Sequence, residues 1–258
     1  MTATVPGWLQ GVWQRKRIDY ADGSSDTASQ VFWLQGLSCY GDLRIPATRP
    51  CVASLGASHA NDLALAHQQG ATGHCHCLDR QATWQREWGY QPVVDFPEPG
   101  DMELHGHCMI ERAPSGAYEE EWQRLTPTDP DIHVWLREDG HARLLVIDTF
   151  AMLIERRSVV LPSRPLAELL QESSQDPQIL LSCEISYAEH GADNNFLIRH
   201  STLPWREGQP LNLCNRQGEI LIPGWQLEEH YPGSSLQQPG TSDPSLGLPP
   251  NSGTGFAG

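Results

Sequence analysis

Apolar residues recur at every second position along most of this 258-residue chain. That spacing places apolar side chains on one face of an extended strand. It predicts strands at residues 12–18, 30–35, 38–45, 73–79, 83–90, 102–112, 118–125, 132–138, 142–155, 179–189 and 195–201, with a weaker pair at 219–222 and 224–228. Turn residues such as Asp139-Gly140 separate neighbouring strands, which indicates an antiparallel meander. Because a long meander leaves open edges unless its sheet closes, we expect an up-and-down β-barrel.

Only two stretches have helical character. Ser58 can cap a helix over residues 61–69, and Ser163 with Pro165 can open another over residues 166–173. Both are short. The predicted fold class is therefore mainly β, an antiparallel up-and-down barrel with one or two short helices.

Composition divides the chain at its C-terminal end. From residue 231 onward, 16 of 28 residues are Gly, Pro or Ser, so residues 231–258 are expected to be a disordered tail and residues 1–230 the folded domain. Trp-Gln-Arg occurs three times, beginning at Trp13, Trp84 and Trp122. This repetition leaves open whether the barrel is duplicated or extended into two subdomains, with a break near residues 113–117.

Charge and cysteine content narrow the partners and the compartment. A net charge of -15 argues against binding nucleic acid or an anionic membrane surface. Seven cysteines, an odd number, and no recognisable leader favour a reducing, cytoplasmic location. No apolar run reaches the roughly 20 residues that span a bilayer. The expected partner is a small-molecule ligand, and a homodimer is left open.

The start of the first predicted strand, Gly11-Val12-Trp13, resembles the Gly-x-Trp signature of the calycin superfamily, which contains the lipocalins and fatty-acid-binding proteins. Residues 31–35, 42–46, 118–122 and 201–208 are similar to a bacterial family of lipocalin-like or Hri1-like proteins. The resemblance implies a calycin-like barrel and assigns no reaction. It also implies that Trp13 packs under a basic residue that closes the barrel floor, for which Arg199 is a candidate.

Alternation sorts the polar residues of the first three strands into faces. Trp13, Arg15, Arg17 and Asp19 share one face, as do Val31, Trp33 and Gln35, and Tyr40, Asp42 and Arg44. If these faces are interior, an aromatic cavity holds fixed polar groups, and Arg44 with Tyr40 can bind a carboxylate while Asp42 orients the guanidinium. The competing interpretation puts Arg44 on the solvent face. The predicted ligand-binding residues are Trp13, Arg17, Trp33, Tyr40, Asp42 and Arg44.

Two His-x-His pairs suggest a metal site. His74 with His76, and His105 with His107, each place two imidazoles on one strand face, and Glu111 completes the His-x-His-x3-Glu spacing of cupins. The later cupin segment has no counterpart, and histidines that only satisfy hydrogen bonds are the competing interpretation. We therefore expect no cofactor, with a transition metal as the alternative.

Motifs for nucleophilic catalysis are missing from the sequence, and Glu119-Glu120-Glu121 is typical of a solvated stretch. Two hypotheses remain. The chain is a lipocalin-like protein that binds a small apolar or amphipathic ligand in a barrel cavity, or it is a small β-barrel enzyme. The enzyme would be metal-assisted and cupin-like, or a cofactor-free isomerase or hydrolase.

Overall fold

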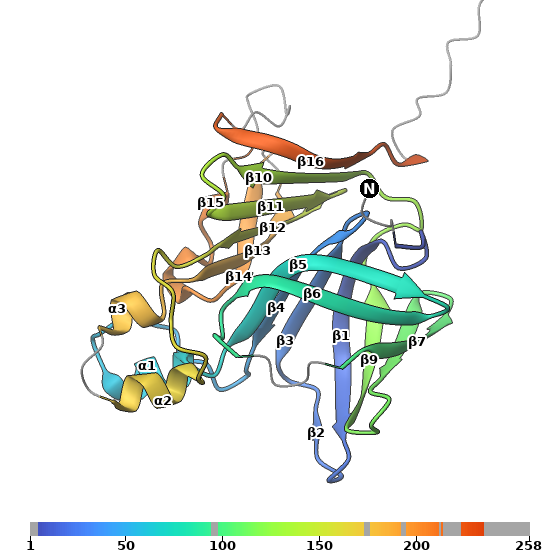
Figure 1. Ribbon diagram of the computed structural model, residues 1–258. Helices are drawn as coiled ribbons and strands as arrows, with labels where there is room; N and C mark the ends of the chain where they lie inside the picture. Colours follow the sequence, from blue (N-terminus) through green and yellow to red (C-terminus); the bar gives the residue numbers. More distant parts are fainter. Residues whose placement is uncertain are drawn as a thin grey trace, which may run out of the picture.

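The computed structural model describes residues 5–93, 98–172, 176–191, 195–211, 213 and 223–234. Within these residues the chain forms two antiparallel sheets and a few short helices (Figure 1). The predicted tail from residue 235 onward and the weak strand at residues 219–222 lie outside the described residues. None of the described helices has the length and apolar character to cross a membrane.

The first sheet is a closed barrel. Its strands follow one another in sequence order, and β1 pairs with both β3 and β9, so eight strands form the wall and β2 adds a short hairpin arm. The strands are β1 (Gly11–Tyr20), β2 (Ser25–Asp26), β3 (Gln30–Gln35), β4 (Cys39–Ile45), β5 (Gln69–Leu78), β6 (Gln81–Gly89), β7 (Gly100–His105), β8 (Cys108–Arg112) and β9 (Tyr118–Arg124). The predicted mainly β fold with an antiparallel up-and-down barrel is confirmed.

The second sheet has seven strands in the order β15-β14-β13-β12-β11-β10-β16. They are β10 (Ile132–Arg137), β11 (Ala142–Ile147), β12 (Phe150–Glu155), β13 (Glu184–His190), β14 (Phe196–Ser201), β15 (Pro210–Leu211) and β16 (Trp225–Tyr231). The helices are α1 (His59–Leu65), α2 (Leu166–Gln171), α3 (Pro177–Leu180) and a 3-10 turn at Pro204–Arg206. The passage from one sheet to the other follows Arg124, whereas residues 113–117 form the turn between β8 and β9.

Two long predicted strands are in fact hairpins. Residues 102–112 divide at Gly106, and residues 142–155 divide at Asp148, because both residues have positive φ angles of 64° and 50°. A left-handed residue reverses the chain in a tight turn, and Gly and Asp adopt that conformation most readily. The apolar alternation continues on both sides of each turn, so periodicity alone does not reveal it.

The two sheets share one hydrophobic core. Phe32 and Leu34 of β3 and Leu43 of β4 point away from the barrel interior and pack against the second sheet. Phe32 stacks on Tyr187 of β13 with ring centroids 3.9 Å apart. At Gly41 a Cβ atom would lie 2.8 Å from the Met152 sulfur, so a larger residue there would displace the Met152 side chain.

Buried charged side chains also hold the barrel and the second sheet together. Glu229 of β16 accepts hydrogen bonds from the backbone N–H groups of Leu37, Ser38 and Cys39, at 2.7–2.8 Å, and from the Ser38 hydroxyl. Arg143 of β11 is 2% exposed and pairs with Glu87 of the barrel at 2.8 Å. Glu229 thus joins the C-terminal strand of the second sheet to the β3–β4 hairpin, and the Arg143–Glu87 pair joins β11 to β6.

Trp13 closes one end of the barrel. Its side chain is fully buried, its Nε1 donates to the Leu9 carbonyl at 2.8 Å, and the Arg124 guanidinium lies 4.2 Å from its ring centre. Arg124 is therefore the basic residue over this tryptophan; Arg199 lies on the second sheet, where it pairs with Glu189. Gly11 has a φ of 127°, and a Cβ there would lie 2.4 Å from Thr126 Oγ1.

Replacing Trp13 with Ala is expected to lower the free energy of unfolding by about 3–5 kcal/mol, because it leaves a large cavity under Arg124. Chemical denaturation followed by circular dichroism measures the loss. Trp13→Phe, which keeps a ring but removes the indole donor, should lose less. A cost under about 1 kcal/mol for Trp13→Ala would show that the barrel end does not depend on this ring.

Glu229→Gln is expected to destabilise the protein by at least about 2 kcal/mol, because an amide group cannot accept all four hydrogen bonds and leaves buried N–H groups unpaired. The matched control is Glu138→Gln, an exposed position in the turn that follows β10, with an expected change within about 0.5 kcal/mol. Equal effects of the two substitutions in urea unfolding would contradict a clamping role for Glu229.

Candidate functional site

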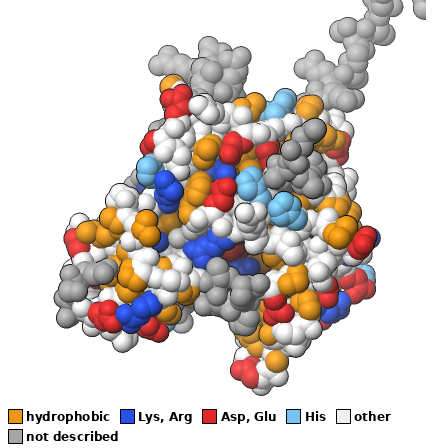
Figure 2. Space-filling view, viewed as in Figure 1, with side chains coloured by type: hydrophobic (Ala, Val, Ile, Leu, Met, Phe, Trp, Pro, Cys, Tyr) orange, Lys and Arg blue, Asp and Glu red, His pale blue; other side chains and the backbone are white. Residues whose placement is uncertain are grey.

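The barrel encloses a cavity of about 600 Å³. Its lining includes residues near the end of the barrel opposite Trp13, among them Tyr20, Ser29 and Pro46, so it opens away from the closed floor. Near the centre of the face drawn in Figure 2, basic and acidic side chains lie together in a hollow. The volume falls within the range of small-molecule sites.

Strands β3 and β4 supply one wall of the cavity. Val31, Trp33, Tyr40, Asp42 and Arg44 all line it. The structure therefore places Arg44 inside the barrel, although Leu43 and Ile45 are also buried. Both faces of β4 are covered because the second sheet packs on its outer side, and this is why the apolar pattern alone favoured the opposite orientation.

Strand β1 does not keep one face along its length. Its pairing with β9 shifts between Arg15 and Arg17, which is a β-bulge. Arg15 consequently points into the cavity together with Ile18 and Tyr20, whereas Arg17 is half exposed and pairs with Asp19 on the outside. The expectation that Arg17 shares the interior face is wrong for this reason. Trp13 is interior but forms the floor and does not line the cavity.

A network of ion pairs crosses the cavity wall. Glu120 of β9 accepts from Arg15 at 2.9 Å and from Arg44 at 3.2 Å through the same oxygen, Oε1. Arg15 also pairs with Asp26 at 3.0 Å, and Arg44 with Asp42 at 3.0 Å. Each guanidinium therefore already has two carboxylate partners, and neither is left to bind an acidic ligand alone.

The other oxygen of Glu120 has no hydrogen-bond partner among the described residues, although the side chain is fully buried. A buried carboxylate oxygen without a donor costs free energy. A ligand or a water molecule that donates a hydrogen bond would remove this cost. The cavity thus contains one strong acceptor that the protein itself does not satisfy.

Glu111 lies opposite Glu120 in the pairing of β8 with β9. It accepts from the Tyr118 hydroxyl at 3.0 Å and from Trp122 Nε1 at 3.1 Å. Burial, followed by the charge of Glu120, raises the pKa of Glu111 to about 8. At neutral pH Glu111 accordingly holds a proton, next to Glu120, which pairs with two arginines.

Aromatic rings form the apolar part of the wall. Trp33 contacts Trp84 and Trp122 edge to face, with ring centroids 5.6 Å and 5.7 Å apart. Tyr40 lies on the same inner surface. Such a surface suits the apolar body of a ligand, because rigid rings offer large contact area at little entropic cost.

The structure does not bring the predicted metal-binding residues together. His74 and His76 lie on the outer face of β5, where His74 contacts Glu87; His105 pairs with Glu103 on the surface, and His107 is exposed in the turn before β8. Glu111 points into the barrel. Among the described residues these five side chains form no group of three within metal-binding distance.

Sequence reasoning missed several residues of the cavity. Trp84, Tyr118, Glu120 and Trp122 all line it. Arg15 lines it too; strand alternation placed Arg15 on one face with Trp13 but did not single it out as a ligand-binding residue. The interpretation of Glu119-Glu120-Glu121 as solvated is wrong for Glu120, because Glu120 alternates with its two neighbours and points inward. The available signal was the spacing of Tyr118, Glu120 and Trp122, which places two aromatic residues and one acid on a single strand face.

Comparisons with known proteins do not assign this chain to a family. No family model and no curated protein matches the chain. Among solved structures, a lipocalin-like protein from Bacteroides uniformis shares 11% sequence identity with a TM-score of 0.31, over 45% of this chain and 98% of that protein. The fold assignment therefore depends on the chain's own eight-stranded antiparallel barrel, closed at one end by Trp13 and Arg124.

Proposed function

We propose that this protein is a lipocalin-like carrier that binds a small amphipathic molecule in the barrel cavity. The observation that carries the proposal is the unsatisfied oxygen of Glu120 within an aromatic cavity of about 600 Å³. A ligand hydroxyl or ammonium group donates to this oxygen, while the apolar part of the ligand packs on Trp33, Trp84 and Trp122. This arrangement is typical of small-molecule sites, which combine apolar walls with a few placed polar groups.

Charge balance selects the ligand class. Arg15 and Arg44 are each paired with two carboxylates, so a carboxylate ligand at either arginine would add negative charge beside Glu120 and would not meet an unpaired guanidinium. A neutral alcohol or an amine adds a donor and no repulsion. In this proposal Arg44 does not anchor a ligand carboxylate, as the sequence suggested; it holds Glu120 in place.

Three ligands with the same chain and different head groups test the ligand class. Decanol and decylamine are expected to quench the fluorescence of the cavity tryptophans. The concentrations needed should be at least about tenfold lower than for decanoate, because decanoate cannot make the charge-assisted hydrogen bond to Glu120, which is worth about 1.5–3 kcal/mol. Tightest binding by decanoate would favour a carboxylate anchor instead. If none of the three binds, the carrier proposal fails.

Matched variants locate the binding. Ala71 lines the cavity, whereas Ala60 is exposed on α1. Ala71→Leu fills part of the cavity and is expected to weaken binding of decanol at least about tenfold, while Ala60→Leu leaves it unchanged. Equal binding by both variants would place the ligand outside the barrel.

A second candidate function is acid–base catalysis in the same cavity. The paired positions of Glu111 and Glu120 favour it, because Glu111 retains a proton that it can donate, and the Glu120 oxygen that lacks a donor can accept one from the same bound substrate. In an isomerisation Glu120 takes a proton from one substrate atom and Glu111 gives one to another. A proton then passes from Glu120 back to Glu111, so both carboxyl groups return to their starting state and no co-reactant is consumed. This mechanism requires Glu111 to hold its proton at neutral pH.

The protonation of Glu111 has a measurable effect on stability. Its pKa is about 8 in the folded protein and about 4.3 in the unfolded chain, so between these values the folded state holds a proton that the unfolded state has released. The stabilisation from this group is complete below about pH 4 and is lost as the pH rises to 8.

Glu111→Gln removes this dependence. The free energy of unfolding of the variant minus that of wild type is expected to rise between pH 5 and pH 8 by up to about 1.4 kcal/mol for each pH unit, and then to level off. Guanidinium unfolding at five pH values measures it, with Glu138→Gln as a control whose difference stays constant. A flat difference for Glu111→Gln would show that Glu111 is ionised at neutral pH.

A further inference from the structure

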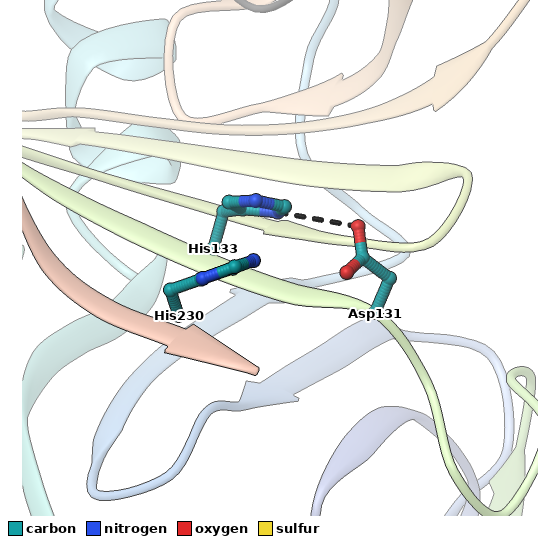
Figure 3. Close-up of side chains that lie close together, drawn as sticks. All are labelled: Asp131, His133 and His230. Atoms are coloured by element: carbon teal, nitrogen blue, oxygen red, sulfur yellow. Dashed lines mark ion pairs between the residues drawn. The ribbon is translucent and has the colours of Figure 1, made fainter. Parts of the chain in front are cut away.

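A second cluster of chemically active side chains lies outside the barrel, on the second sheet. Asp131 directly precedes β10, His133 lies on β10, and His230 lies on β16 directly opposite His133 in the strand pairing. One ligand atom of each side chain lies within 4.8 Å of the others (Figure 3). Among the described residues this is the one group of three or more His, Cys, Asp or Glu side chains placed so closely.

The donors match a divalent transition metal. Two imidazoles and one carboxylate form a set used by Zn²⁺ and related ions, which takes three protein ligands and leaves a position open. Ligand atoms around tetrahedral zinc are about 3.4 Å apart, because each bond is about 2.1 Å long. Closing on an ion therefore requires side-chain tips to move by roughly 1 Å, which rotation about χ angles provides.

The surroundings carry negative charge that no cation balances. One oxygen of Asp131 is buried without a hydrogen-bond partner, and so is one oxygen of Asp148. Asp148 lies next to Asp131, whose backbone N–H donates to it at 2.8 Å. Within the described part of the chain neither carboxylate pairs with Lys or Arg, and the one ion-pair contact of Asp131 is to His133 at 3.3 Å.

The cluster is also accessible and held on regular structure. The His133 side chain is 23% exposed, and His230 is exposed on the edge strand. Both belong to the hydrogen-bonded pair of strands β10 and β16, so their Cα positions are fixed by the sheet. His133 also stacks on Trp135 with ring centroids 5.2 Å apart, which limits the freedom of its ring.

We propose that Asp131, His133 and His230 bind one divalent transition-metal ion of the Zn²⁺ class. The ion links the edge strand β16 to β10, next to the position of Glu229, which connects β16 to the barrel. Its effect is therefore to stabilise the attachment of the C-terminal strand. The proposal does not depend on any ligand in the barrel cavity.

The full chain, stripped of metal with a chelator and titrated with ZnCl₂ by calorimetry, tests the proposal. One Zn²⁺ per chain is expected, and the melting temperature should rise with metal concentration because the ion binds the folded state. Replacing Zn²⁺ with Co²⁺ should give a visible absorption band from a low-symmetry site. Wild type that binds no stoichiometric ion would overturn the proposal.

Variants assign the site. His230→Ala, at an exposed position, and Asp131→Asn are each expected to weaken Zn²⁺ binding at least about tenfold, since even residues one step outside a metal centre cost that much. His105→Ala combined with His107→Ala removes a comparable exposed pair and should leave binding and the Co²⁺ band unchanged. Circular dichroism checks that each variant is folded. Binding lost only in the His105 and His107 variant would overturn the assignment.

Discussion

The packing of the second sheet against the outer face of β3 and β4 is the contact on which the rest of the structure depends. It covers Phe32, Leu34 and Leu43 with residues of β11, β12 and β13, so these apolar side chains need not turn into the barrel. The inner face of the same strands is then available for Asp42, Arg44 and the tryptophans. An isolated barrel of this size would place its apolar residues inside and its charges in solvent.

The buried carboxylates inside the barrel are stabilised by ion pairs with arginine side chains. Removing a charged group from water costs several kcal/mol unless partners replace the lost hydration. Glu120 meets this cost through Arg15 and Arg44 at one oxygen and leaves the other oxygen unsatisfied. Glu111, which has no arginine at hydrogen-bond distance in the described structure, meets it by retaining a proton. Whether a buried carboxyl group of the cavity holds a proton therefore depends on whether it has an arginine partner.

The side chains of strand β16 make contacts on both faces of the second sheet. Glu228 and Glu229 of this strand reach Arg143 and the β3–β4 hairpin, and the adjacent His230 faces His133 on the other side. Glu229 and His230 lie on opposite faces because side chains alternate along a strand, whereas a bulge in the pairing with β10 leaves Glu228 on the same side as Glu229. A change in the attachment of β16 would consequently affect the interface that covers the barrel strands.

The sequence by itself determined most of the strand positions and the closed antiparallel barrel, since these follow from period-two alternation and turn residues. The role of Trp13 as the floor of the barrel came from the resemblance of Gly11-Val12-Trp13 to the calycin signature. Three features depended on tertiary structure. The orientation of Arg44 required the second sheet, because both faces of its strand are covered. The outward turn of Arg17 required a bulge that alternation does not reveal. The clusters around Glu120 and His133 join residues more than 70 positions apart, and only strand pairing decides which such residues meet.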